Sequence, residues 1–262
     1  MIITLSPSKG QNFDSPASTT QFTLPQQLEQ TKVLIDAIRT LDVEAIQTLM
    51  NVSEKIASLT VDRIKQFKTP FTLGNAKQAL YAFSGDVYRS IEVDDYSADD
   101  LDYAQSHLRM LSGLYGYLRP LDLIQAYRLE MKTKLQNPRG ANLYAFWDER
   151  ITDLLNEDLL NEERLGQSEP ILINLASNEY FKSIKTKKLK GDVLNIIFKE
   201  SKEGKTRVIA IYAKWARGLM ANWIIRNRIE NIEALKAFDL EGYRYNKQLS
   251  DKKQWTFSRS QP

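Results

Sequence analysis

Hydrophobic residues in the first half of the chain recur at the three- or four-residue spacing of amphipathic helices. Residues 25–40 follow this pattern behind Pro25, a residue suited to the first turn of a helix. Residues 43–50 and 53–67 repeat the pattern, and Ser53 is placed to cap the second of these helices. The spacing also predicts helices over residues 75–83 and from the S-A-D-D sequence at Ser97 to about Leu111.

The second half combines short β-rich runs with one long helical pattern over residues 213–229. The strand candidates are IITLS (2–6), ILINL (171–175), VLNIIFKES (193–201) and TRVIAIYA (206–213). The last two are joined by KEGK, which predicts a hairpin, and the YRY and WTF runs of the tail predict another at a sheet edge. No repeat or linker divides the chain, so we predict one α+β domain over residues 1–262, with a mixed β-sheet and surrounding helices.

The segment HLRMLSGLYGYLRPLDLIQAYRLEM (107–131) breaks the helical pattern with two glycines. Gly113 is placed to end one helix and Pro120 to start another. A hairpin between two helices exposes backbone N–H groups, and Arg109 and Arg119 would add charge around them. The segment is therefore similar to the helix-hairpin-helix motif that contacts DNA phosphates, although two residues rather than one separate Gly113 from Gly116. The alternative is an ordinary turn between two helices.

Composition limits the chemistry that the chain can perform. It has 262 residues, no cysteine and a single histidine, His107. Disulfides, thiolate metal sites and zinc sites built from several histidines are therefore excluded. Carboxylate-bound Mg²⁺ or Ca²⁺ stays open, but no metal or cofactor is predicted. The chain has no run of about 18 apolar residues and no export signal, so we expect a cytoplasmic protein without membrane contact.

Charge is distributed unevenly although the net charge is only +3. Residues 91–106 contain six acids and no base, whereas residues 107–140 contain six bases and two acids. The FKSIKTKKLK run adds five lysines, among them Lys182, Lys185, Lys187 and Lys188. Each run taken alone is typical of a solvated surface. If several converge in the fold, they form a basic patch that attracts phosphates.

Six segments together resemble the YaaA family, whose members are bacterial cytoplasmic proteins associated with resistance to peroxide stress. The segments are SPSKG (6–10), FSGDVY (83–88), HLRMLSGLYGYLRPLDL (107–123), YRLEM (127–131), INLASNEYFKSI (173–184) and YAKWARGLM (212–220). They occur in the same order along nearly the whole chain. The resemblance implies a fold particular to the family, a positively charged cleft, a helix-hairpin-helix element, DNA binding and a link to lower free iron under peroxide.

The strand ends suggest where such a cleft lies. Lys9 follows the first predicted strand, Lys182 follows the ILINL strand, and Lys214 and Arg217 follow TRVIAIYA. Cations after several strands are typical of a binding cleft in α/β sheets. Together with the DNA binding that the resemblance implies, these cations lead us to expect largely sequence-independent contact with the backbone of duplex, branched or damaged DNA. The expected contact residues are Lys9, Arg109, Gly113, Gly116, Arg119, Arg128, Lys182, Lys185, Lys187, Lys188, Lys214 and Arg217.

Two other functions stay open. The first is an enzyme that acts on a purine nucleotide or a nucleic-acid base, with Glu179 as general base and the cations as phosphate clamps. Its cleft would contain Ser6, Lys9, Asn174, Ser177, Asn178, Glu179, Lys182, Lys214 and Arg217. The chain lacks the phosphate-binding loop and dinucleotide fingerprints, which weighs against it, and no catalytic residue is assigned. The second is a scaffold that binds a protein partner through its basic face.

Overall fold

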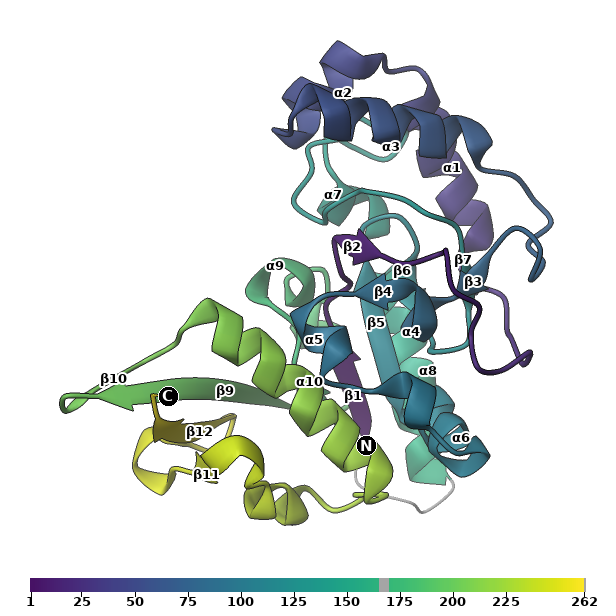
Figure 1. Cartoon of the computed structure of the whole chain (residues 1–262). Coiled ribbons are helices and arrows are strands. Elements are labelled where there is room, and N and C mark those ends of the chain that lie inside the picture. Colours follow the sequence, from purple (N-terminus) through teal and green to yellow (C-terminus); the bar gives the residue numbers. More distant parts are fainter. Residues whose placement is uncertain (165–169, 262) are drawn as a thin grey trace.

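The structure is a computed structural model that describes residues 1–164 and 170–261. A mixed sheet crosses the molecule in the strand order β11-β12-β9-β8-β1-β5-β6, with β10 paired to β9 (Figure 1). Its strands are β1 Ile2–Leu5, β5 Leu108–Ser112, β6 Gly116–Leu118, β8 Ile171–Asn174, β9 Asp192–Lys202, β10 Lys205–Arg207, β11 Arg244–Tyr245 and β12 Gln254–Ser260. The predicted α+β class with a mixed sheet is confirmed.

The centre of the sheet is parallel and its edges are antiparallel. β1 pairs in parallel with β5 on one side and β8 on the other, so Ile3 lies opposite both Leu108 and Ile173. The β1 run IITL is apolar apart from one threonine and wholly buried, as expected of a central strand covered on both faces. The carboxyl ends of β1 and β8 therefore lie side by side, which places the residues that follow them at one edge of the sheet.

Helices surround this sheet and extend beyond it. In Figure 1, α1 Leu28–Arg39, α2 Val43–Met50 and α3 Glu54–Gln66 form a group at the top, while α10 Ala210–Arg226 lies across the sheet. The other α-helices are α4 Ala79–Ala82, α5 Asp86–Arg89, α6 Ala98–His107, α7 Leu143–Trp147, α8 Arg150–Arg164 and α9 Asn178–Phe181. One cluster of buried hydrophobic side chains extends from Met1 to Phe257.

Several short elements connect these helices and strands. Two small sheets pair β2 Gly10–Gln11 with β4 Phe83–Ser84 and β3 Lys77–Gln78 with β7 Leu123–Ile124. The 3-10 helices are η1 Val93–Asp95, η2 Thr186–Lys188, η3 Ile232–Ala237, η4 Leu240–Gly242 and η5 Lys247–Leu249. Among the described residues, no helix is both long enough and apolar enough to cross a bilayer.

The three helices predicted within residues 25–67 are confirmed. Asp42 caps α2 by accepting a hydrogen bond from the N–H of Ala45, and Asn51 ends that helix in the left-handed conformation. Ser53 occupies the N-cap position of α3 with extended backbone angles, although its side chain forms no capping hydrogen bond. α6 begins with the predicted capping box, in which Ser97 and Asp100 bond each other's backbone N–H groups.

The helix-hairpin-helix predicted for residues 107–131 is wrong. α6 ends at His107, and the next residues form β5 and β6, an antiparallel hairpin inside the sheet. Residues 108–118 are all buried, and this largely hydrophobic run, interrupted by Arg109, Ser112 and two glycines, fits a covered strand as well as a helix. Pairing with β1 gives this run the backbone hydrogen bonds that a helix would have supplied.

The two glycines of this hairpin serve packing rather than anion binding. A Cβ atom on Gly113 would lie 2.2 Å from the carbonyl oxygen of Leu129, so only glycine allows the two backbones to approach this closely. Gly116 has φ of +68°, and its missing side chain makes room for the ring of Trp147. Both glycines are buried within the core.

Two other predictions need correction. Residues 75–83 contain α4 between two short strands rather than one helix, and β10 ends at Arg207 instead of continuing to residue 213. The exposed residues after Arg207 lead directly into α10, which begins at Ala210. The KEGK hairpin between β9 and β10 is confirmed, as is the antiparallel pair of β11 and β12 at the sheet edge.

Candidate functional site

A cleft of about 400 Å³ opens at the carboxyl ends of β1 and β8. The residues after β1 (Ser6–Lys9) line one side, and Leu175, Ser177, Glu179 and Tyr180 after β8 line another. α5 contributes Asp86, Val87 and Tyr88, α10 contributes Lys214 and Arg217, and Gly85 and Glu130 complete the wall. The outer edge of neighbouring parallel strands is where open α/β sheets bind ligands. Parts of five of the six family-like segments meet here.

Hydrogen bonds between distant segments hold the floor of the cleft. The Tyr88 hydroxyl donates to the carbonyl oxygen of Ser6 at 2.7 Å. The backbone N–H of Ser177 donates to the Ser6 hydroxyl at 2.8 Å, and that hydroxyl donates to the Ser177 hydroxyl at 3.2 Å. These bonds join the end of β1 to α5 and to the start of α9. The floor is therefore built before any ligand arrives.

α10 approaches the cleft closely because Gly218 removes a side chain at the contact. A Cβ atom on Gly218 would lie 1.9 Å from the carbonyl oxygen of Val87 and 2.1 Å from the Ser90 hydroxyl. The Ser90 hydroxyl also donates to the carbonyl oxygen of Trp215 at 2.8 Å, which fastens α5 to α10. Lys214 and Arg217, three positions apart on one face of α10, are thereby brought to the cleft.

The carboxylate of Glu130 neutralises one side of the cleft. Lys9 lies 2.8 Å from it, Arg128 3.3 Å and Lys132 3.7 Å. Burial opposes ionisation of Glu130, but the hydrogen bond and the charge of Lys9, together with Arg128 and Lys132, hold its pKa below the usual value. Lys9 therefore reaches the cleft as one member of an ion pair rather than as a free cation.

Arg217 and Lys214 have no such partner. Among the described residues, no carboxylate lies within ion-pair distance of either side chain. Burial lowers the pKa of Arg217, and its buried Nε atom has no hydrogen-bond acceptor. A buried donor without an acceptor costs about 1–3 kcal/mol, and more when it is charged. An anion in the cleft would supply the missing acceptor.

The lysines expected at the second strand end do not line the cleft. Lys182 sits over the ring of Tyr144 at 5.3 Å, and Lys185 lies 3.6 Å from Asp148. Lys188 pairs with Glu149. Asn174 is buried, donates to Asn195 at 2.8 Å and accepts from the N–H of Ala176 at 2.9 Å. None of these four side chains lines the cleft.

Arg109 lies in the interior, away from the cleft. Its guanidinium bonds both carboxylate oxygens of Asp158, at 2.8 and 2.9 Å, and contacts the Tyr117 hydroxyl. Arg109, Gly113 and Gly116 have no surface to offer a phosphate, so the structure contradicts their expected part in DNA contact. Arg119 is held by Asp122 at 2.9 Å and by the Leu24 carbonyl at 3.1 Å.

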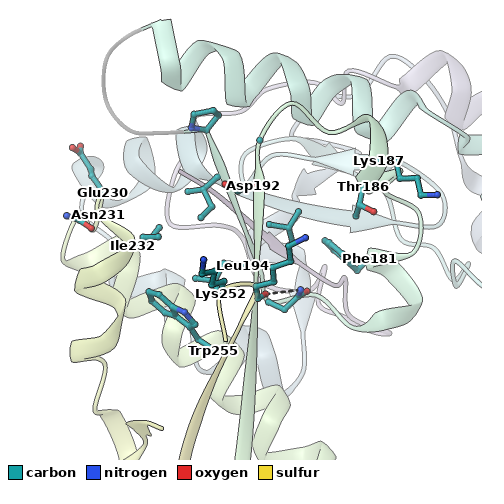
Figure 2. A pocket seen from close by; sticks show the side chains of 16 residues that line it. Phe181, Thr186, Lys187, Asp192, Leu194, Glu230, Asn231, Ile232, Lys252 and Trp255 are labelled. Carbon is teal, nitrogen blue, oxygen red and sulfur yellow. Dashed lines mark hydrogen bonds between the residues drawn. The ribbon is translucent and has the colours of Figure 1, made fainter. Parts of the chain in front are cut away.

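A second, larger hollow of about 1120 Å³ lies where β8 and β9 begin (Figure 2). Figure 2 shows Lys187 and Lys252 among its cations and Asp192 and Glu230 among its acids. Trp255, on its wall, has a ring already covered by Lys236 at 4.6 Å. The mixed charges and the occupied ring indicate no particular ligand. Lys187 belongs to this hollow rather than to the cleft.

Sequence reasoning missed Tyr88 and Glu130 as parts of the site. Both lie in family-like segments, FSGDVY and YRLEM, and Glu130 is one of only two acids among the bases of residues 107–140. That isolated acid was the available signal. Within the described residues, no group of three His, Asp or Glu side chains is arranged to hold a metal ion.

Comparisons with known proteins show the family to which the chain belongs. A family model described as peroxide stress protein YaaA matches residues 1–249. A UPF0246 protein of Alteromonas mediterranea is 49% identical over 261 residues, covering 100% of this chain and 99% of its own length. UPF0246 proteins of Shewanella amazonensis and Acaryochloris marina are each 51% identical, covering 95% and 99% of this chain and 95% and 100% of their own lengths. The chain therefore belongs to the YaaA family of peroxide stress proteins.

Proposed function

We propose that this protein serves the peroxide stress response by binding the phosphate backbone of DNA at the cleft, largely without regard to sequence. The observation that carries the proposal is Arg217, a partly buried cation that faces the cleft without a carboxylate or an acceptor for Nε. Lys214 adds a second unpaired charge and Lys9 a third cation beside Glu130. Phosphate oxygens are strong acceptors for guanidinium and ammonium groups.

The volume of the cleft limits which forms of DNA can enter it. A volume of about 400 Å³ lies in the range of small-ligand sites and admits a nucleotide, but not the width of a duplex. A base leaves its stack most easily where the strand is single, mismatched or damaged. The proposal therefore favours branched or damaged DNA over intact duplex.

The same proposal explains a peroxide role without a metal centre in the protein. The chain has no cysteine and one histidine, a poor donor set for transition metals. Protection would act on the DNA, which is the target of iron-dependent oxidative damage, and not on the iron. Covering or marking an altered strand requires only a phosphate clamp and access to one nucleotide.

Fluorescence anisotropy of labelled single strand, duplex and branched junction at four salt concentrations tests the proposal. Log affinity should fall linearly with log salt, at about −0.9 per phosphate contacted in a duplex and about −0.7 in a single strand. Arg217→Ala should weaken every sequence alike and reduce the slope by about one contact. Arg244→Ala is the matched control, because Arg244 is an exposed arginine paired with Asp239 and lies outside the cleft. Absence of binding to every DNA form would refute the proposal.

An enzyme acting on a purine nucleotide is the second candidate, and two of the three carboxylates that line the cleft favour it. Glu130 and Glu179 line the same wall as the cations, an arrangement suited to a general base beside a phosphate clamp. Glu179 accepts the N–H of Lys132 at 3.2 Å, which fixes one of its oxygens. This function predicts saturable binding of a mononucleotide with a shallow salt slope. It also predicts turnover that Glu179→Gln abolishes without loss of binding.

A further inference from the structure

The end of β9 and the whole of β10 form a two-stranded hairpin, residues 199–208, that we call the ribbon. Figure 1 shows the ribbon projecting past the other strands of the sheet at one side of the molecule. Residues 202–208 are all exposed. The chain leaves the ribbon at Arg207 and enters α10 at Ala210, so the ribbon is joined directly to the helix that carries Lys214 and Arg217.

The ribbon has the features of a rigid element. Its two-residue loop, Glu203 and Gly204, has φ values of +52° and +74°, the left-handed pair that matches the twist of a tight hairpin. The Ser201 and Thr206 hydroxyls lie 2.8 Å apart across the strands, and the N–H of Gln261 donates to the Ser201 carbonyl at 2.9 Å. These contacts preorganise the ribbon for a partner.

One face of the ribbon carries three cations. Lys202 lies directly opposite Lys205, and Arg207 lies on the same face two positions further along. Like charges placed directly opposite each other destabilise a hairpin. Among the described residues, no carboxylate pairs with any of the three. Glu200, which lies opposite Arg207, is already bound to Arg259 at 2.9 Å and to the Tyr243 hydroxyl.

A groove lies beside the cleft, on the side of α10 and β12, and one of its residues contacts the base of the ribbon. Tyr212, Trp215 and Arg259 line the groove, and Asp86 lines both the groove and the cleft. Arg259 lies over the Tyr212 ring at 5.2 Å and pairs with Glu200 at the base of the ribbon. Both carboxylates of the groove are paired, Asp86 with Arg89 at 2.6 Å and Glu241 with Arg259 at 2.9 Å, so a polyanion that leaves the cleft on this side meets no unpaired acid in the groove.

We propose that the ribbon is a second contact for the phosphate backbone of the same nucleic acid whose phosphate enters the cleft. The inference rests on the proposed DNA binding and adds the path of the strand outside the cleft. Nucleic acid fits better than a small anion because its charges repeat at short, regular intervals.

The test compares a ribbon variant with a matched control. The ribbon variant combines Lys202→Gln and Lys205→Gln, and the control combines Lys247→Gln and Lys252→Gln, two exposed lysines of the tail. Each removes the same charge. Anisotropy is measured with a labelled single strand of thirty nucleotides and one of four, both at several salt concentrations.

The ribbon variant should behave differently on the two DNA oligonucleotides. On the long strand, the ribbon variant should lose roughly tenfold in affinity at low salt, and its salt slope should fall by about two phosphate contacts. The short strand reaches only the cleft, so the ribbon variant should bind it with the same affinity as the unaltered protein. Its melting temperature should match or exceed that of the unaltered protein because the opposed lysines no longer repel. The control should change neither affinity nor slope by as much.

Two results would overturn the inference, and they are distinguishable. If the unaltered protein binds the long strand and Arg217→Ala weakens it, but the ribbon variant binds no worse than the control, the ribbon is not a contact and the cleft proposal stands. If the unaltered protein binds neither single strand at any salt concentration, the ribbon inference falls, and the cleft proposal falls with it only if the duplex and the branched junction are not bound either.

Discussion

Arg109 and Arg217 are two partly or fully buried arginines that the sequence marks in the same way, each within a basic, family-like segment. The structure gives them opposite environments. Arg109 has a carboxylate with two bonds, a tyrosine hydroxyl and three backbone carbonyls around its guanidinium. Arg217 has a buried Nε without an acceptor. The comparison teaches that a buried cation indicates a ligand only when the protein leaves a hydrogen-bond donor of that cation without an acceptor.

Removal of the partner of Arg109 is the strongest way to break this comparison. Asp158→Ala leaves a buried guanidinium and the Tyr117 hydroxyl without their carboxylate. Loss of one member of a buried ion pair costs about 3–5 kcal/mol, so the free energy of unfolding should fall by that amount. Urea denaturation followed by circular dichroism measures it. A loss below about 1 kcal/mol would mean that Arg109 is solvated and not structurally bound.

Gly218→Ala tests whether the close approach of α10 positions the free cations. The new methyl group would meet the Val87 carbonyl and the Ser90 hydroxyl, so α10 must move away from α5. We expect a loss of about 1–3 kcal/mol in the free energy of unfolding, with weaker DNA binding because Lys214 and Arg217 shift.

Gly74→Ala is the control for that substitution. The nearest atom to its added methyl group is the Thr72 hydroxyl oxygen at 3.7 Å, an ordinary contact. Denaturation and anisotropy should both match the unaltered protein. Equal behaviour of the two glycine variants would show that α10 adjusts without consequence for the cleft.

Arg217→Ala tests the second arginine of the comparison. DNA affinity should fall about tenfold, which corresponds to roughly 1.4 kcal/mol. The free energy of unfolding should be unchanged or slightly higher because no ion pair is lost. The same denaturation series therefore separates the two arginines: loss of the Asp158 carboxylate lowers stability, whereas loss of Arg217 does not. A large loss of stability in Arg217→Ala would make it a structural residue.

The pH dependence of Glu130 gives the smallest expected effect. Its pKa is lower in the folded protein than in the unfolded chain, so its stabilising contribution is present above about pH 4.3 and disappears as pH falls through the folded pKa. Because solvent reaches the surrounding lysines, Glu130→Gln should cost at most about 1 kcal/mol at pH 7. The difference from the unaltered protein should shrink as the pH falls below about 4.3 and vanish once Glu130 is protonated in the folded protein. Denaturation midpoints across this range measure it.

Elements with a regular hydrophobic spacing or clear ends could be predicted from the sequence, whereas the structure of residues 108–118 could not. α1, α2 and α3 follow from side-chain spacing, and β1 and β8 from short apolar runs with clear ends. The run 108–118 fits a strand and a helix equally well, and only its pairing with β1 decides between them. Pairing partners more than a hundred positions apart leave no local signature.

The residues of the candidate site likewise divide into those that could be predicted from the sequence and those that could not. Lys9, Lys214 and Arg217 were predicted together because each follows an expected strand, although β10 ends well before Lys214. Arg109 was grouped with them because its partner, Asp158, lies 49 positions away and no local pattern joins the two. Contacts between residues far apart in the sequence decide which cations the fold neutralises. Runs of charge in the sequence alone therefore could not distinguish the free cations from the bound ones.

The hydrogen bonds at the floor of the cleft also have a consequence for how the protein matures. Ser6 is bound to Tyr88 and Ser177, 82 and 171 positions later in the chain, and Arg217 arrives later still. Contacts of this span are slow to form, because a long loop must close before any of them is made. During synthesis the ribosome must therefore release most of the chain before the cleft exists. A nascent chain interrupted before α10 would carry the strands of the site but no capacity to hold an anion there.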